Sequence, residues 1–228
     1  MRVVFFGSGS FGLPVLEDLA TWAEVALVVS QPDRPAGRNR VPTATPVSQA
    51  ALNAGLPLLR CEDVNQANAR AQLEAASADA WVVIAFGQKL SSDCLAGRFA
   101  INLHASCLPR WRGASPIHHA VMYGDQETGV SVITLADQMD AGDVLAMESV
   151  AIGPTETTGE LHDRLALVGP ALVRRVLEAF DQDVVTPVPQ DSSAVTMAPR
   201  LKRQDAILHM DMSGFEMRCM INGCAPWP

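Results

Sequence analysis

Two kinds of segment alternate along the chain. Short runs that are apolar on both faces have the length of β-strands, and they occupy residues 2–6, 25–30 and 80–86. Longer segments with apolar residues every three or four positions lie between or after them, as at residues 46–54 and 157–180. Strands that are apolar on both faces are typical of a parallel sheet covered by helices. The pattern therefore predicts an α/β fold of the Rossmann-like, doubly wound class, with a mostly parallel sheet.

Two further predicted strands, at residues 100–104 and 130–135, each lead into a loop that carries polar residues. Asn102 and His104 are two positions apart on the first strand, so their side chains should project from the same face. The loop after the second strand carries Asp140. Because sites in doubly wound folds lie outside the carboxyl ends of the strands, we expect these three side chains to form one site.

A carboxamide, an imidazole and a carboxylate at one site suit acyl transfer through a tetrahedral transition state. Asn102 would donate a hydrogen bond to the oxyanion. His104 would move protons or donate as an imidazolium, and Asp140 would set the charge and tautomer of its ring. These three residues are the predicted catalytic residues. No metal is required, because side chains alone can hold the oxyanion.

The residues around this site also resemble a known family. From Asn102 to Pro116 the chain reads Asn-x-His-x-Ser-x-Leu-Pro-x-Trp-Arg-Gly-Ala-x-Pro, and Asp140 begins Asp-x-Gly-Asp. This pattern is similar to that of the folate-dependent formyltransferases. The resemblance implies that the formyl donor is 10-formyltetrahydrofolate, and it assigns catalysis to the same Asn, His and Asp. It also makes Asp140 rather than Asp143 the catalytic acid.

Other stretches are most similar to the members of this family that formylate the α-amino group of methionine on initiator tRNA. They are the first strand at residues 1–7, the loop at residues 31–38 and the closing Cys-Ala-Pro-Trp-Pro at residues 224–228. In those members the loop after the second strand contacts the acceptor end of the tRNA. The resemblance therefore makes Arg38 and Arg40 the expected tRNA-binding residues.

The sequence indicates the acyl-transfer chemistry more clearly than it indicates the acceptor of the formyl group. A sugar amine or glycinamide ribonucleotide is an alternative acceptor, and a formyl-folate hydrolase is an alternative activity, because all share the Asn, His and Asp set. The loop at residues 31–38 and the closing Ala-Pro-Trp-Pro argue against them. A folate-binding module without catalysis is a further alternative.

The resemblance also places the folate against the loops that follow two strands. Residues 86–90 correspond to the family loop whose backbone reads the pterin ring, with Phe86 in place of the common Tyr and Lys89 in place of an apolar residue. Cys107 is expected to be a small buried residue and not a nucleophile. The expected folate-binding residues are Phe86, Gly87, Gln88, Leu90, Ser106, Leu108, Pro109 and Asp137.

One glycine pattern suggests a different class of enzyme. Gly7-x-Gly9-x-x-Gly12 fits the dinucleotide fingerprint, and Asp33 lies about where a ribose-binding acid is expected. An NAD-dependent oxidoreductase is therefore an alternative. Two features count against it: Asp33 follows Pro32 beyond the strand end, and no hydride-transfer residues rival the acyl-transfer set.

Composition limits the partners and the compartment. Hydrophobic residues make up 48% and charged residues 18% of the 228 positions, as in globular chains. No apolar run approaches the ~20 residues of a membrane span, and the N-terminus lacks a signal-peptide pattern, so we expect a cytoplasmic monomer without membrane contact. The five cysteines are odd in number and lack Cys-x-x-Cys spacing, which favours reduced thiols over a zinc site. The net charge of −8 lowers the tRNA affinity expected of this chain by itself.

The expected organisation has three parts. Residues 1–183 would form the formyltransferase catalytic domain, and the proline-rich residues 184–205 a linker. Residues 206–228 would be the start of a truncated C-terminal tRNA-binding domain, which the resemblance implies is a basic barrel. We expect Phe215 and Trp227 to be partly unsupported in this chain.

Overall fold

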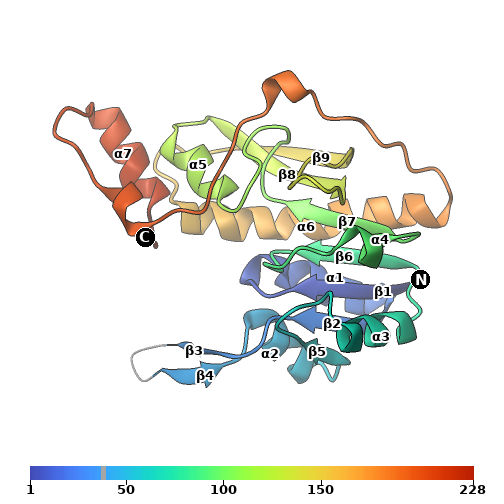
Figure 1. Ribbon diagram of the computed structural model, residues 1–228. Helices are drawn as coiled ribbons and strands as arrows, with labels where there is room; N and C mark the ends of the chain where they lie inside the picture. The colour runs from blue at the N-terminus through green and yellow to red at the C-terminus, as the bar shows by residue number, and fades with distance from the viewer. Residues whose placement is uncertain (37–39) are drawn as a thin grey trace. The chain divides into compact units, whose positions relative to one another are not determined.

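The computed structural model describes residues 1–36 and 40–228, which divide into two compact units (Figure 1). The first unit comprises Met1–Leu103 and Val173–Val184. The second comprises His104–Leu172 and Val185–Pro228. Within the described residues, no helix is both long enough and apolar enough to cross a membrane.

Five parallel strands form the centre of the first unit, in the order β5-β2-β1-β6-β7. Every residue of β6, which lies between β1 and β7, is buried, in agreement with the apolar run in the sequence. The register places Val3 beside Ala80 and Val82 beside Ile101, so apolar side chains line up across the sheet. The strands are β1 (Arg2–Gly7), β2 (Glu24–Ser30), β5 (Leu58–Arg60), β6 (Ala80–Ile84) and β7 (Phe99–His104).

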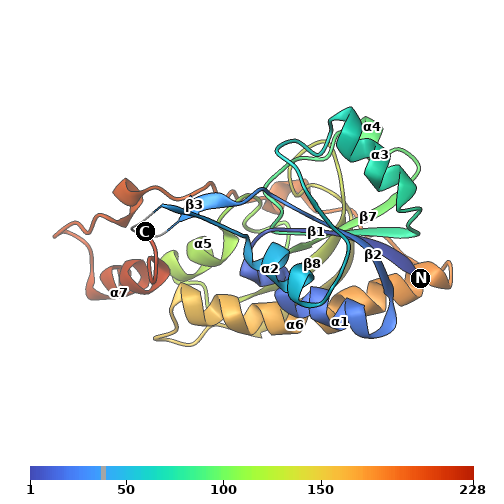
Figure 2. The ribbon, with the colours of Figure 1, turned by 90° about the horizontal axis from the view of Figure 1, so that it is seen from below.

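Helices cover both faces of this sheet (Figure 2). One face carries α1 (Leu13–Trp22, after the turn η1 at Ser10–Gly12), α2 (Pro46–Asn53) and the end of α6 (Thr158–Asp181); the other carries α3 (Ala67–Ala75) and α4 (Ser92–Leu95). Arg174 of α6 donates to Asp18 of α1 at 2.7 Å, and the ring of Phe180 stacks on that of Phe99 at 3.9 Å. The predicted doubly wound α/β class is therefore confirmed.

A small hairpin in the first unit was not foreseen from the sequence. Strands β3 (Arg34–Ala36) and β4 (Val41–Thr43) pair antiparallel and extend away from the five-stranded sheet of the same unit (Figure 1). Arg40 lies in the turn before β4 with an exposed side chain. Arg38, the other residue expected to bind tRNA, lies outside the described residues.

The second unit contains an antiparallel strand pair and several helices. In the strand pair, Glu127 lies opposite Ala151. The elements are β8 (Glu127–Thr134), β9 (Val144–Ala151), α5 (Pro116–Met122), the first part of α6, α7 (Gly214–Gly223) and the turns η2 (Ser192–Ala194) and η3 (Arg203–Ala206). Strand β9 was not predicted from the sequence, because most of its side chains are not buried and its apolar run ends after four residues, at Glu148.

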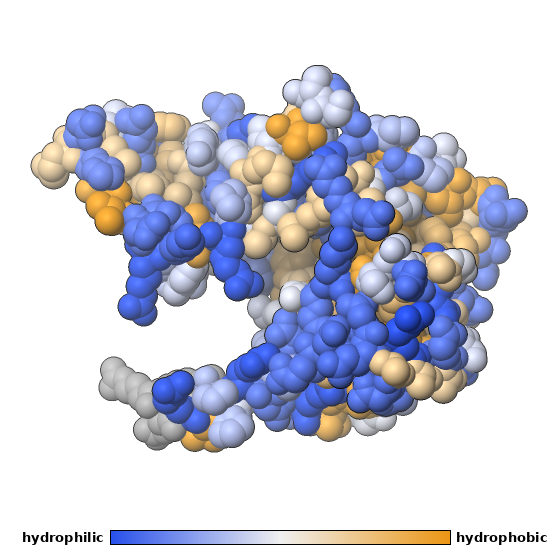
Figure 3. Space-filling model, viewed as in Figure 1, coloured by the Kyte–Doolittle hydropathy of each residue, from blue (hydrophilic) through white to orange (hydrophobic). Residues whose placement is uncertain are grey.

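The C-terminal residues pack on the second unit through α7. Thr158 Oγ1 donates to the carbonyl oxygen of Gly223 at 2.8 Å, and the Gly159 amide donates to that of Ala225 at 3.1 Å. Phe215 and Trp227 are nevertheless 54% and 47% exposed, as expected, and apolar surface is visible over α7 in Figure 3.

Candidate active site

His104 and Asp140 lie side by side in the second unit. His104 ends β7, and its Nδ1 is 3.6 Å from Oδ2 of Asp140. Its Nε2 is 2.9 Å from the carbonyl oxygen of Trp111. The side chains of the pair are only 7% and 14% exposed. Because both ring nitrogens face oxygen acceptors, an imidazole ring protonated on both nitrogens has a partner on each side.

The loop between β8 and β9 holds Asp140 in a constrained conformation. Its φ is +53°, in the left-handed region that disfavours residues with a Cβ. Its Oδ2 also accepts a hydrogen bond from the Gly113 amide at 2.9 Å. Asp143 closes the loop through its backbone, since its amide donates to Thr134 Oγ1 and its carbonyl oxygen accepts from the Thr134 amide. This backbone role agrees with the structural role expected for Asp143.

The loop after His104 is held together by buried hydroxyl groups. Ser106 Oγ donates to the carbonyl oxygen of Arg110 at 2.6 Å. Ser131 Oγ of β8 donates to the Ser106 carbonyl oxygen and accepts from the Leu108 amide, at 2.7 and 3.1 Å. Sequence reasoning missed Ser131, whose only signal was a polar residue within an apolar strand. The bonds of Ser106 and Leu108 are thus internal to the loop, and folate binding by them or by neighbouring Pro109 stays a prediction.

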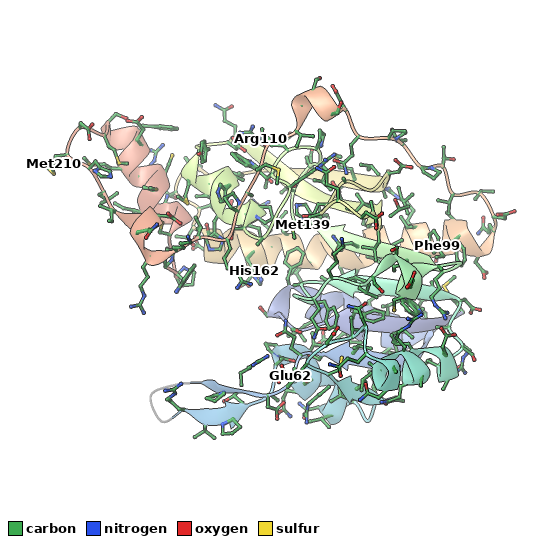
Figure 4. All side chains as sticks on the ribbon, viewed as in Figure 1. Glu62, Phe99, Arg110, Met139, His162 and Met210 are labelled. Atoms are coloured by element: carbon green, nitrogen blue, oxygen red, sulfur yellow. The ribbon has the colours of Figure 1, made fainter. Side chains whose placement is uncertain are left out.

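Arg110 anchors the far side of this loop. Its Nε and Nη2 donate to the two carboxylate oxygens of Asp125 at 2.8 and 2.6 Å (Arg110 is labelled in Figure 4). Trp111 Nε1 donates to the same carboxylate at 2.7 Å, and the guanidinium lies 4.3 Å from the Trp111 ring centroid. Hydrogen bonding to Asp125 raises the pKa of Arg110. The contacts of Arg110 are therefore structural.

A segment of the expected linker runs along the same loop. The Arg112 amide donates to the Thr196 carbonyl oxygen at 2.9 Å, and the Ala198 amide donates back to that of Arg112 at 2.7 Å. The buried guanidinium of Arg112 donates to Gln190. Nothing in the local sequence pattern pointed to Gln190, because its partners are about 50 and 78 residues away in the chain.

Asn102 belongs to the first unit, two residues before His104 on β7. It lies opposite Val83 of β6, and its side chain is half-buried. Alternation along a strand gives Asn102 and His104 the same face of β7. The oxyanion-binding role of Asn102 stays a prediction.

The side chains of the expected pterin loop are turned into the protein. The Phe86 ring packs edge-on against Phe6 at 5.6 Å, and Leu90 is also buried. The Gln88 side chain accepts from the Val64 amide and donates to the Cys61 carbonyl oxygen, both at 2.8 Å. Gly87 has a φ of +79°. The side chains of Phe86, Gln88 and Leu90 are thus engaged within the protein, and folate binding by residues 86–90 stays a prediction.

Two amides of the glycine loop after β1 are occupied within the protein. The Ser8 and Gly9 amides both donate to the Ala85 carbonyl oxygen, at 3.2 and 3.3 Å. A dinucleotide site needs such amides to face the pyrophosphate. Asp33, the expected ribose acid, is paired with Arg60 at 3.2 Å. This geometry argues against the NAD-dependent alternative.

The remaining residues near the site either lie at the surface or carry an unreactive side chain. Asp137 and Met139 are exposed on the β8–β9 loop, Met139 by 64% (Figure 4). Burial, and then the charge of Glu127, raise the pKa of Cys107 to about 11, so its thiol stays protonated at neutral pH and is a poor nucleophile. Among the residues that the structure describes, no group of three or more His, Cys, Asp or Glu side chains could hold a metal ion.

A family profile described as formyl transferase matches residues 1–177. The chain belongs to the formyl transferase family. This formyl transferase is 42% identical over 231 residues to a methionyl-tRNA formyltransferase of Moorella thermoacetica, across 100% of this chain and 74% of that protein. It is 39% identical over 230 residues to one of Streptococcus pneumoniae, again across 100% of this chain and 74% of the relative. The family expected from the sequence is confirmed.

Solved structures give the same fold. A sugar 3N-formyl transferase superposes with a TM-score of 0.75 at 13% identity, covering 98% of this chain and 78% of its own. HypX from Aquifex aeolicus, in complex with tetrahydrofolic acid, gives 0.74 at 15% identity, covering 100% of this formyl transferase and 35% of HypX. At these identities the likeness establishes the fold alone.

Proposed function

We propose that this protein transfers the formyl group of 10-formyltetrahydrofolate to the α-amino group of methionine on initiator tRNA. The observation that carries the proposal is the match, at 42% identity and across 100% of the chain, to a methionyl-tRNA formyltransferase. Its substrates would be the folate and the initiator tRNA, and we expect the reaction to take place in the cytoplasm, where translation occurs. The close pairing of His104 with Asp140 at 3.6 Å supports the same chemistry.

The reaction forms a bond between the methionine nitrogen and the formyl carbon, and breaks the bond from that carbon to N10 of the folate. Asn102 donates to the oxyanion that develops on the formyl oxygen. His104 donates to this oxyanion or relays to N10 the proton that the methionine amine releases, so that N10 leaves as the amine of tetrahydrofolate. Asp140 orients the His104 ring through Nδ1 and stabilises its protonated form.

Folate contacts are proposed on two loops, each taken by itself: residues 86–90 in the first unit and residues 106–109 in the second. Phe86 and Leu90 are buried, the Gln88 amide is paired inside the protein, and the carbonyl oxygens of Phe86 and Lys89 accept side-chain hydrogen bonds. A pterin ring would therefore meet the remaining main-chain groups of residues 86–90. A main-chain site fits a heterocycle edge, because peptide groups offer donors and acceptors in alternation. Asp137, which is exposed, would contact the rest of the folate.

Arg38 and Arg40 are the proposed contacts to the tRNA backbone. Arg40 is exposed at the turn before β4, and guanidinium groups pair well with phosphates. Because contacts between arginine and phosphate release counterions, tRNA transfer should slow as ionic strength rises.

Single-turnover transfer of labelled formyl from 10-formyltetrahydrofolate tests the proposal. Methionyl initiator tRNA is the acceptor, and an amino sugar nucleotide, glycinamide ribonucleotide and buffer alone are the comparators. Transfer to the tRNA well above the comparators is the expected result. Transfer to a sugar amine or hydrolysis alone would overturn the acceptor and keep the active-site chemistry.

Two histidine variants, one at the site and one away from it, provide the control. His104→Ala should abolish most of the transfer. His162→Ala removes a histidine of α6 that is paired with Asp163 and lies on no predicted site, and it should leave the rate unchanged.

A further inference from the structure

The side-chain amide of Gln190 makes four hydrogen bonds. Its Oε1 accepts from Nε and Nη2 of Arg112, at 3.0 and 2.8 Å. Its Nε2 donates to the carbonyl oxygens of Asp140 and Gly142, at 2.8 and 2.7 Å. One side chain therefore joins the loop that carries Asp140 to the loop that carries Arg112.

Asp140 benefits from this external support. Its φ of +53° is disfavoured for a residue with a Cβ, so the conformation persists only where the surroundings fix it. The two bonds from Gln190 Nε2 fix the carbonyl groups of Asp140 and Gly142, which flank Ala141. The orientation of these peptide groups in turn decides where the Asp140 carboxylate points.

Arg112, which donates to Gln190 Oε1, is itself held firmly in place. Its guanidinium is buried, and its backbone is bonded on both sides to Thr196 and Ala198. The next residue is Gly113, whose amide donates to the Asp140 carboxylate at 2.9 Å. Gln190, which is bonded to Arg112, holds the backbone of Asp140, and Gly113, the neighbour of Arg112, holds its carboxylate.

We propose that Gln190 is a positioning residue, which holds the Asp140 carboxylate against the His104 ring during group transfer. The role requires a carboxamide, since this group alone combines two N–H donors with an acceptor on a side chain of this length. The expected effect on turnover rests on the proposed formyl transfer, whereas the hydrogen bonds of Gln190 do not.

Two substitutions separate positioning from folding. Gln190→Glu keeps an acceptor for Arg112 and so preserves the pairing of a buried cation, but it sets a carboxylate oxygen against two carbonyl oxygens. Gln190→Met keeps the length of the side chain and loses all four bonds. Asp191→Ala is the matched control: Asp191 is the adjacent residue, and its carboxylate caps η2 by accepting from the Ser193 amide and hydroxyl.

The first readout is the single-turnover rate with methionyl initiator tRNA and saturating folate. Both Gln190 variants should slow the chemical step by about 10²-fold, which is the effect expected of a catalytic group displaced by about 1 Å. The folate concentration that gives half the maximal rate should change little, and Asp191→Ala should behave as wild type. A Gln190→Glu enzyme with the wild-type rate would overturn the proposal, because anchoring Arg112 would then suffice.

The second readout is the ¹⁵N NMR signals of the His104 ring, which need no acceptor. Both Gln190 variants should change these signals, because the carboxylate beside Nδ1 moves, and Asp191→Ala should not. Unchanged His104 signals in folded Gln190→Glu and Gln190→Met would overturn the proposal. If wild type proves unable to formylate the tRNA, the proposed function fails on the rate, and the NMR comparison still decides the role of Gln190.

Discussion

Oδ2 of Asp140 is 3.6 Å from Nδ1 of His104, and the same oxygen accepts a hydrogen bond from the Gly113 amide at 2.9 Å. The carboxylate is therefore shared between a titratable ring and a fixed backbone donor. The backbone bond restrains the carboxylate beside the ring. An amide at this position would keep the hydrogen bond and lose the charge.

Asp140→Asn is the substitution that tests the charge. Its side-chain oxygen still accepts from Gly113, so the loop should stay folded, but the ring of His104 loses its anionic partner. We expect the transfer rate at neutral pH to fall by about 10²–10⁴-fold, the range typical of positioned acid–base groups. Single-turnover rates over a range of pH give the measurement.

Asp143→Asn makes the same chemical change on the same loop and is the control. Asp143 closes the loop through its backbone, so the transfer rate of the Asp143→Asn enzyme should stay near that of wild type. A similar loss in both variants would contradict a specific role for Asp140.

Asn102→Ala tests the oxyanion donor. Removing one such donor typically lowers the rate by about 10²–10³-fold, with a smaller effect on substrate binding. The transfer rate at saturating substrates is the quantity to measure. Asn53→Ala, at the end of α2, where the side chain only accepts from Gln49, should have no effect. An Asn102→Ala enzyme that keeps more than half of the wild-type turnover would refute the assigned role.

The sequence predicted the parts of this molecule that are encoded locally. The apolar runs predicted β1, β2 and β6, and the Asp140 loop followed from the end of a predicted strand. Short polar elements such as the β3–β4 hairpin carry too few apolar residues to produce a periodic signal. They could not be found in this way.

The contacts that hold the site were the least predictable. Gln190 and Ser131 act on loops that are distant in the chain, and a lone polar residue in a proline-rich segment or a strand gives no indication of its partner. Residues 184–205 looked like a linker because they contain Pro187, Pro189 and Pro199 and small polar residues, which are typical of both linkers and well-ordered extended segments. Only the fold distinguishes the two.

Cys107→Ala should keep full activity. The Cys107 thiol has a pKa raised to about 11 by burial and then by Glu127, so it carries no reactive thiolate at neutral pH. Transfer rates of the variant and of wild type, measured side by side, should agree. A large loss would give Cys107 a chemical role that its surroundings do not support.

The same thiol should contribute to alkaline unfolding. In the unfolded chain a thiol ionises near its ordinary pKa of 9.0, whereas folded Cys107 stays neutral to about 11. The unfolded state is therefore favoured increasingly as pH rises through this window, and the stability present below pH 9 is lost. Urea denaturation at several pH values should show a shallower alkaline loss in Cys107→Ala. An identical pH dependence would contradict the assigned pKa.

Gly113→Ala should destabilise the protein through the segment that lines the active-site loop. Gly113 has a φ of +124°, and a Cβ there would lie 2.6 Å from the Ala198 carbonyl oxygen, which also accepts from the Ser115 amide. Both the backbone conformation and the close approach oppose a side chain. We expect a loss of roughly 2–4 kcal/mol in the free energy of unfolding, measured by urea denaturation.

Gly55→Ala separates these two effects. Gly55 has a φ of +66°, but a Cβ there would meet nothing within 4 Å, so only the backbone penalty of about 1 kcal/mol applies. It should also leave transfer unaffected, whereas Gly113→Ala should slow it, because the displaced loop carries the amide that holds Asp140. Equal losses of stability in the two variants would mean that the segment containing Ala198 moves away from the new Cβ at no cost in free energy. Residues 190–198 would then be too loosely attached to hold Asp140 in place.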